Sequence, residues 1–346
     1  MPRPKLKVSI FSLAKEFGVS APTISKALSN SNEVSDALRE RVRARAEELG
    51  FRPTRPRRKN FNLCVVLDME FHNRFRFSGF QEAVVEGVYG FCDEKGVEFS
   101  LYAQTTEKLN AVNLTRELHL RNADGAVVIG ASGDRSYFGN LRKSRLPFCC
   151  IFDGPDDRVV SVDNHAAGRL AFDHLHALGH HRIAIARQAA DRTAARDRFL
   201  GFVRRAGEAG LEDGAVTELL PESPYSAFDW GRGLLVDWLE GGRPWSGIFC
   251  LAENVALGIL SEAAMRGVRI PADLSVIGCD DLLLAQRSAP PMSVVDIPNR
   301  AAGCEAAQRV WRELNDPGDR DRDGTLLPVE RVIARATTGP RGGINR

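Results

Sequence analysis

The sequence lacks both a cysteine framework and a long apolar run. Its seven cysteines include no C-x-x-C pair, and several lie inside apolar runs such as F-C-C-I-F. An odd count without framework spacing argues against a disulfide-stapled fold and is typical of a reducing compartment, where cysteine serves as a small buried hydrophobe. No stretch is apolar for long enough to span a bilayer. Since M-P-R-P-K-L-K-V also has no signal-peptide core, we expect a cytoplasmic protein.

Motifs for catalysis and metal binding are lacking too. The sequence contains no G-x-x-x-x-G-K-S/T phosphate loop, no G-x-S-x-G nucleophile turn and no H-E-x-x-H zinc helix. His180 and His181 are adjacent, but no Cys, Asp or Glu stands at ligand spacing, and histidine pairs in loops are usually solvated. We therefore expect no metal, no cofactor and no enzymatic activity.

Charge is distributed unevenly along the chain. Residues 1–60 contain 14 Lys and Arg against 6 Asp and Glu, whereas residues 61–346 contain 33 against 39. The overall net charge of +2 thus hides a basic head of +8 on an acidic body of −6. Clustered basic residues on a small domain are the electrostatic footprint of phosphate binding, so the head is a candidate nucleic-acid reader.

The basic head has the pattern of three short helices. Gly18 can adopt the left-handed backbone of a tight turn, Ser20 can cap the next helix, and Pro22 falls in its first turn, where a missing N–H costs little. Ser35 caps the third helix and Gly50 ends it. Apolar residues at helical spacing predict the buried faces: Ile10, Leu13, Ala14 and Phe17, then Ile24, Ala27 and Leu28, then Leu38, Val42, Ala46 and Leu49. Two helices around a glycine turn and a third that closes the core predict a helix-turn-helix domain.

The body alternates short apolar runs with amphipathic stretches. The predicted strands are Leu63–Leu67, Val97–Tyr102, Ala126–Ile129, Phe148–Phe152, Ile183–Ala186, Gly247–Leu251 and Leu274–Gly278. The predicted helices include Gly79–Lys95, Asn164–Leu178, Thr193–Ala209 and Asn254–Arg266. Such alternation predicts an α/β fold with parallel sheets covered on both faces, and about 280 residues suit two doubly wound lobes.

These features give the expected domain organisation. A helix-turn-helix domain occupies residues 1–50, a basic linker that contains proline occupies residues 51–60, and a ligand-binding and dimerisation core occupies residues 61–340. The expected N-lobe comprises about residues 61–161 and 294–325, and the C-lobe about residues 162–293 and 326–340.

The sequence resembles the lactose/galactose repressor (LacI/GalR) family of bacterial transcription regulators over nearly its whole length. In the head the likeness rests on L-A-K-E-F-G-V-S-A-P-T-I-S-K-A-L-S and A-E-E-L-G-F-R-P. In the body it rests on S-V-D-N-H-A-A-G-R-L-A-F-D-H-L, R-D-R-F-L-G-F, R-G-V-R-I-P-A-D-L-S-V-I-G-C-D-D and the terminal L-P-V-E-R-V-I-A-R-A-T-T. The resemblance implies a two-lobed core like that of periplasmic binding proteins, with a ligand cleft between the lobes. It also implies a homodimer that places two heads on a near-palindromic operator.

The chain departs from the family pattern at three places. The family usually follows its R-P with a hinge helix whose leucine wedges into the minor groove, but this chain has no leucine between Leu49 and Leu63. Ala252 and Glu253 stand where the family commonly has Asn-Asp, and Lys26 replaces an arginine near the end of the recognition helix. The first departure puts the usual operator bending in doubt, and the second obscures the identity of the ligand.

The resemblance implies which residues of the head read DNA. Ala21 and Pro22 would contact a thymine methyl, and Lys26 would donate to guanine O6 and N7. The alternative for Lys26 is a phosphate contact, which fixes register without reading sequence. Four hydroxyls at the start of the helix and along it would position phosphates, namely those of Ser20, Thr23, Ser25 and Ser29. A solvated helix end explains Ser29 equally well.

The linker is basic, with five of eight residues in 52–59 being Lys or Arg. Prolines at 53 and 56 disfavour a helix. Arg55, Arg57 and Arg58 are therefore expected to lie as an extended arm in a narrow A·T-rich minor groove. The alternative is a flexible tether that touches phosphates without preference.

The resemblance also implies the effector residues, namely Asp153, Arg198 and Asp280. Asp153 and Asp280 end predicted strands, where ligands of open α/β sheets bind. Carboxylates accept from paired hydroxyls and an arginine fork donates to oxygens, so this set suits a sugar or a similar small polar ligand. The alternatives are surface salt bridges or helix caps, which are the better explanation for Asp281.

Several further residues are candidates for the same cleft. An aromatic side chain from Tyr225, Phe228 or Trp230 would stack on the ligand, although core packing explains each of them equally well. Asp68, Arg74 and Arg76 follow the first predicted strand and would face the cleft from the opposing lobe.

The sequence as a whole predicts a transcription regulator, a repressor whose operator affinity a small ligand controls. A sugar-binding protein without a regulatory role is the alternative, but the basic head argues against it. An enzyme of sugar chemistry is a third possibility, which the lack of a catalytic constellation disfavours. The expected partners are operator DNA, a sugar-like effector and a second copy of the chain.

Overall fold

The computed structural model describes residues 9–28, 34–49, 61–69, 79–130, 136–144, 146–153, 156–187, 193–221, 226–316 and 323–341. The chain forms two compact units, Met1–Asn60 and Phe61–Arg346, each of which has its own core. Among the described helices, none is both long and apolar enough to cross a membrane.

The first unit contains three helices around one small core. They are α1 (Ile10–Phe17), α2 (Ala21–Leu28) and α3 (Asp36–Glu48). Ser9 caps α1, and Gly18 follows the helix with φ = 66°, the left-handed conformation that the sequence predicts. The predicted apolar faces meet, with Leu13, Ile24 and Val42 fully buried. This confirms the helix-turn-helix prediction, while Gly50 lies outside the described residues.

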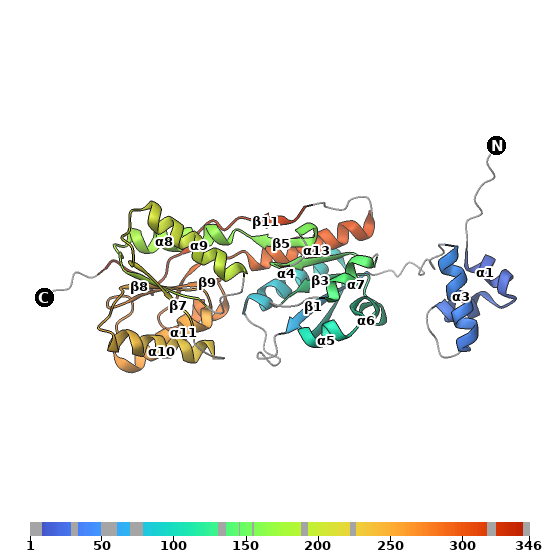
Figure 1. Cartoon of the computed structure of the whole chain (residues 1–346), viewed down its shortest axis with the longest axis horizontal. Helices are drawn as coiled ribbons and strands as arrows, with labels where there is room; N and C mark the ends of the chain where they lie inside the picture. Colours follow the sequence, from blue (N-terminus) through green and yellow to red (C-terminus); the bar gives the residue numbers. More distant parts are fainter. Residues whose placement is uncertain are drawn as a thin grey trace. The chain divides into compact units, whose positions relative to one another are not determined.

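The second unit is built on two sheets of six strands each, which confirms the predicted fold class (Figure 1). The order in the first sheet is β11-β5-β4-β3-β1-β2, and in the second it is β12-β10-β9-β8-β6-β7. Every pairing is parallel except that between β10 and β12. The strands are β1 (Asn62–Met69), β2 (Glu98–Thr105), β3 (Gly125–Ile129), β4 (Phe148–Ile151), β5 (Val159–Val162), β6 (Ile183–Ala186), β7 (Val216–Leu219), β8 (Gly247–Cys250), β9 (Ser275–Cys279), β10 (Ser293–Val295), β11 (Thr325–Leu327) and β12 (Val332–Ile333).

Helices cover both faces of each sheet, because side chains on successive strand positions point to opposite faces. On the first sheet, α4 and α13 pack on one face, and α5, α6 and α7 on the other. On the second, α10 and α11 pack on one face, and α8 and α9 on the other. These elements are α4 (Gly79–Lys95), α5 (Thr106–Ala111), α6 (Leu114–Leu120), α7 (Tyr137–Lys143), α8 (Asn164–Ala177), α9 (Thr193–Glu208), α10 (Ala227–Glu240), α11 (Glu253–Arg266) and α13 (Asn299–Asn315), with the short helices η2 (Asp156–Arg158) and α12 (Leu283–Arg287) between strands.

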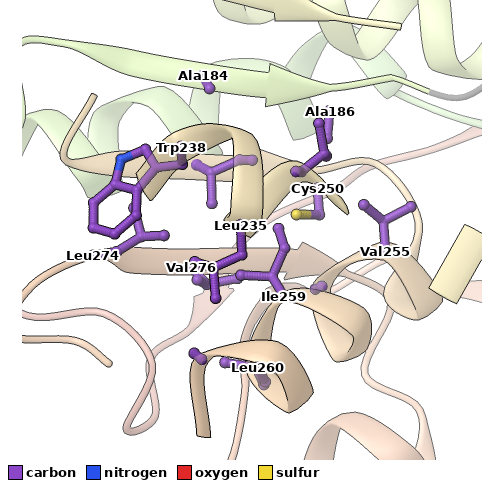
Figure 2. Packing of buried hydrophobic residues seen from close by; sticks show 14 of the residues in the cluster. Ala184, Ala186, Leu235, Trp238, Cys250, Val255, Ile259, Leu260, Leu274 and Val276 are labelled. Atoms are coloured by element: carbon purple, nitrogen blue, oxygen red, sulfur yellow. The ribbon is translucent and has the colours of Figure 1, made fainter. Parts of the chain in front are cut away.

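Figure 2 shows one of these layers, in which α10 and α11 pack against the second sheet. Trp238 and Leu235 of α10 and Ile259 of α11 belong to one cluster with the strand residues Cys250 and Val276. Cys250 is fully buried among apolar side chains, and burial raises its pKa. It therefore acts as a small hydrophobe, as the sequence predicts.

Three helix pairs cross at reciprocal glycines. Gly87 of α4 lies against Gly303 of α13, where a Cβ on either residue would overlap a backbone carbonyl of the other helix. The same arrangement occurs in α8 with α9 and in α10 with α11, through Gly168 with Gly201 and Gly231 with Gly258. Only glycine allows backbones to approach this closely, so these residues fix the spacing of the helix layers.

Residues 325–341 contribute to both sheets. β11 pairs with β5 at the edge of the first sheet, and β12 pairs with β10 at the edge of the second. Thr337 then donates its hydroxyl to Val276 O at 2.6 Å and accepts from Ser293 N at 2.8 Å. Thr337 thereby ties the residues that follow β12 into the second sheet.

His180 also contacts the segment that follows β12. Its Nε2 lies 3.1 Å from Gly339 O, a carbonyl that can only accept, so Nε2 carries the proton. Nδ1 then accepts from Ser246 Oγ at 2.9 Å. His180 is 2% exposed and burial lowers its pKa. The expectation of a solvated histidine pair is therefore wrong for His180, because these bonds compensate its desolvation, and it holds only for the exposed His181.

Candidate functional site

The predicted DNA-reading residues lie on α2 of the first unit. Pro22, Ser25 and Lys26 are exposed, whereas Ala21 and Thr23 are half-buried. Because helix positions three and four apart share a face, Pro22, Ser25 and Lys26 lie together on one outward side of α2. An exposed helical face in a basic head is the surface that the major groove accommodates.

Ser20 and Thr23 are engaged with each other at the start of α2. Ser20 Oγ accepts from Thr23 N at 3.3 Å, and the two hydroxyls lie 2.8 Å apart. Ser20 is therefore the N-cap that the sequence predicts, and any phosphate contact would have to share its hydroxyl. Ser29, Arg55, Arg57 and Arg58 lie outside the described residues.

An arginine of the head joins α3 to α1. Arg45 donates from Nε to Glu16 at 2.6 Å and from Nη1 to Glu48 at 2.7 Å. Hydrogen bonds to these two carboxylates raise the pKa of Arg45. These interactions engage Arg45 with two carboxylates of the head itself.

In the second unit, Arg198 and Asp280 lie beside each other at the carboxyl edge of the second sheet. Asp280 directly follows β9 and is buried, and Arg198 is buried on α9. Burial raises the pKa of Asp280, while the Arg198 charge and a hydrogen bond from Asn299 oppose that rise. The structure therefore brings together two of the three effector residues that the resemblance implies.

The backbone at Asp280 has a conformation rare for a residue with a side chain. Its φ is 70°, and its N–H donates to Val295 O at 3.0 Å. Left-handed backbone of this kind is destabilising outside glycine and often marks a functional site. The turn after β9 thus fixes the direction in which the Asp280 carboxylate leaves the sheet.

Two asparagines hold this charged pair, and sequence reasoning missed both. Asn164, the first residue of α8, accepts from Arg198 Nε at 2.9 Å. Asn299, the first residue of α13, donates from Nδ2 to Asp280 Oδ1 at 2.8 Å. The only signal in the sequence was an asparagine at each helix start, which capping alone would explain.

On the first sheet, Asp153 follows β4 and is half-buried. Its N–H donates to Ile151 O at 2.8 Å, and the preceding Phe152 has φ = 65°. Asp153 therefore also leaves the carboxyl edge of its sheet through a constrained turn, as a ligand residue of an open α/β sheet would.

Asp68 has a different surrounding from the one expected. It is 1% exposed, and its two oxygens accept from Thr106 Oγ1 at 2.5 Å and Tyr137 Oη at 2.8 Å. Both acceptors are thus used inside the first lobe, so Asp68 fixes neighbouring elements and is not available as an open ligand contact. Arg74 and Arg76 lie outside the described residues.

The aromatic candidates are only partly placed. Phe228 is exposed on α10, Trp230 is half-buried against the core beneath α10, and Tyr225 lies outside the described residues.

Asp281 forms an ion pair with Arg335 at 2.5 Å, which confirms the salt-bridge interpretation of that residue. No group of three or more His, Cys, Asp or Glu among the described residues could hold a metal ion.

Glu253 lies where the two lobes approach each other. Its Oε1 accepts from Ala285 N at 2.8 Å, and a Cβ added to Gly79 of α4 would lie 3.5 Å from Oε2. Burial raises the pKa of Glu253 to about 7, more than the Ala285 hydrogen bond lowers it, and Asp280 and Asp281 add to the rise. The carboxyl is therefore close to half-protonated at neutral pH.

The raised pKa makes the stability of the core depend on pH. Because the folded-state pKa lies above the unfolded value of 4.5, the free energy of unfolding should fall as pH rises from about 4.5 through about 7, then level off. Glu253→Gln keeps the acceptor for Ala285 N but cannot ionise. It should remove on the order of 2–3 kcal/mol of this pH dependence, as urea titrations between pH 5 and pH 8 would show. A variant with the same pH profile as the natural chain would refute the role of Glu253.

Comparison with known proteins gives two matches to family models. A model of the bacterial regulatory proteins of the lacI family matches residues 9–54. A model of the periplasmic binding protein-like domain matches residues 172–338. The helix-turn-helix unit and the second unit thus each match a family model.

Relatives with the same organisation match almost the whole chain. The transcriptional regulator CelR of Thermobifida fusca is 27% identical over 330 residues, which are 91% of this chain and 94% of that protein. The transcriptional repressor PurR of Aliivibrio fischeri (strain MJ11) is 26% identical over 337 residues, 95% of this chain and 98% of that protein. Among solved structures, a CelR–cellobiose complex has a TM-score of 0.67 at 23% identity, with 96% of this chain and 100% of that chain covered. A lac repressor dimer bound to operator and anti-inducer has a TM-score of 0.66 at 21% identity with the same coverage, so both likenesses concern the fold.

Proposed function

The chain is a LacI-family transcriptional regulator, in which a lacI-type helix-turn-helix domain precedes a periplasmic-binding-protein-like core, and from that premise we propose that it is a repressor controlled by a sugar-like ligand. The observation that carries the proposal is the buried Arg198–Asp280 pair at the carboxyl edge of the second sheet, in a chain whose head exposes Lys26 on α2. A donor and an acceptor fixed in a buried setting suit the hydroxyls of a sugar.

The ligand set that we propose is Arg198 and Asp280 from the second sheet and Asp153 from the first. Binding between the sheets would favour one relative placement of the lobes, and the ligand shifts that equilibrium only by its differential affinity for the two states. The cellobiose in the CelR structure supports a sugar as the chemical class. Asp68 would act only indirectly, by holding Thr106 and Tyr137 in the first lobe, and the exposed Phe228 would stack on the ligand.

The DNA partner would be a near-palindromic operator bound by a homodimer in the cytoplasm. The lac repressor in the operator complex is a dimer, which supports this arrangement. The alternative function is that of a sugar-binding protein without a regulatory role, and the lacI-type head argues against it.

Mobility-shift assays with the DNA upstream of the chain's own gene, with and without a panel of sugars, test the proposal. Failure to bind that DNA at low salt would refute it.

Lys26→Ala is expected to weaken operator binding more than binding to random duplex. If Lys26 donates to a guanine edge, its loss should cost about 1–3 kcal/mol on the operator, while a phosphate contact would weaken both duplexes alike. Titrations of both duplexes at several salt concentrations measure the two effects, and the natural chain should show a steep salt slope.

Lys15→Ala is the matched control, because Lys15 is also an exposed lysine of the head but lies on α1. It should lower the affinity for both duplexes similarly or leave both unchanged. Equal losses on the operator and on random DNA for Lys26→Ala would assign Lys26 to phosphate.

A further inference from the structure

Asn299 lies at the point where the chain passes from one lobe to the other. The preceding Ile297 is buried in the core between α8, α9 and the second sheet, whereas Ala302 is buried in the core between α4, α13 and the first sheet. Asn299 itself is 2% exposed and begins α13. Its hydrogen bond to Asp280 therefore links a helix that packs on the first sheet to a carboxylate at the edge of the second.

The orientation of the Asn299 amide is set by chemistry. The Asp280 carboxylate can only accept when ionised, so the amide nitrogen must face it and Nδ2 donates at 2.8 Å. Oδ1, on the same carbon, must then point away from that bond. Among the described residues Oδ1 is buried and has no hydrogen-bond partner.

A buried acceptor without a donor is uncommon in a folded protein and calls for an explanation. Here the acceptor stands beside the residues of the proposed ligand site, since Asn299 bonds Asp280 and Asp280 interacts with Arg198. Arg198 is itself fixed through Asn164. A ligand hydroxyl at this place would supply the donor that Oδ1 lacks and would find a second acceptor in the Asp280 carboxylate.

We propose that Asn299 is a further ligand-recognition residue, which orients Asp280 through Nδ2 and accepts a hydrogen bond from a ligand hydroxyl through Oδ1. The inference rests on the proposed function and specifies the ligand. Two neighbouring acceptors with an arginine beside them suit hydroxyls on adjacent carbons, each of which donates to one acceptor and can accept from the guanidinium. The ligand class is therefore a polyol with vicinal hydroxyls, bound at the start of α13.

Titration calorimetry of the full chain with neutral monosaccharides and disaccharides, including cellobiose, tests this. For a sugar that binds the natural chain, Asn299→Ala should raise the dissociation constant about tenfold or more, since one hydrogen bond and the orientation of Asp280 are lost. Asn299→Leu keeps the side-chain volume and should have the same effect, which covers the case in which the smaller residue fails to fold. Asn315→Ala is the matched control, because Asn315 ends the same helix and is exposed.

Deoxy analogues of that sugar distinguish a direct hydrogen bond between Asn299 and the ligand from an indirect effect of Asn299 through Asp280. Removing the hydroxyl that meets Oδ1 should weaken binding to the natural chain but not weaken it further in Asn299→Ala. An unchanged dissociation constant in both Asn299 variants, or a full deoxy penalty that persists in them, would overturn the inference alone. If no sugar of the panel binds the natural chain, the inference and the proposed ligand class both fail, while binding to operator DNA is still measured independently.

Discussion

Gly87→Ala is expected to destabilise the core unit by about 3 kcal/mol, since an added methyl would meet the Arg300 carbonyl of α13. A backbone carbonyl cannot move aside as a side-chain end can, so α4 and α13 would have to separate along their contact. The higher helix propensity of alanine offsets only about 1 kcal/mol. Thermal unfolding should show a decrease in Tm of roughly 5–10 °C.

Gly90→Ala provides the control within the same helix. A Cβ at Gly90 would meet no atom within 4 Å, so the substitution should stabilise by about 0.5–1 kcal/mol. Gly168→Ala and Gly207→Ala form the same contrast in α8 and α9, since Gly207 also has open space around it. A Gly87→Ala variant with a Tm equal to or above that of the natural chain would show that the helix spacing tolerates a methyl.

Arg198→Ala is expected to abolish the ligand response at concentrations that saturate the natural chain. The change would remove the donor that we propose for the ligand, and it leaves Asp280 buried without the cation that opposes the rise of its pKa. Losing one partner of a buried charged pair costs about 2–5 kcal/mol, so the ligand dissociation constant should rise between about thirtyfold and several thousandfold. Calorimetry with a binding sugar measures the loss directly.

Arg196→Ala separates this effect from a general change in α9. Arg196 lies two residues earlier, is exposed, and pairs only weakly with Asp197 at 3.4 Å. Its removal should leave ligand affinity within about twofold, in keeping with the small energies of surface ion pairs. Operator binding in the absence of ligand should survive both substitutions, and an Arg198 variant with normal ligand affinity would remove Arg198 from the proposed site.

The sequence predicted the head and most of the central strands because these depend on local patterns. The short inner strands β5 and β10 were not predicted. Leu13, Ile24 and Val42 each belong to a set of apolar residues at helical spacing within one helix. The central strands β1, β3, β8 and β9 are continuous apolar runs buried on both faces. The edge strands β7, β11 and β12 were not predicted. Each has two to four residues and none that is fully buried, so no apolar run marks them.

The site was less accessible to sequence reasoning, because its geometry depends on contacts between distant residues. Asn299 and Asp280 are 19 positions apart, and Asn164 and Arg198 are 34 apart. Asp68 looked like an open carboxylate at a strand end until the structure placed Tyr137 against it from 69 residues away. The position of a residue at a strand end predicts at which edge of the sheet its side chain lies. It does not predict whether residues of another element already occupy the hydrogen-bonding groups of that side chain.

The position of β11 and β12 in the chain has a consequence for synthesis. These two strands lie within nine residues of each other, at 325–333, yet they complete different sheets, and Thr337 and Gly339 follow to bond β9 and His180. During translation neither sheet can gain its last edge strand until this segment has left the ribosome. The two lobes therefore each need this one segment to complete their sheets, and a chain that stops before residue 325 would leave an open edge on both.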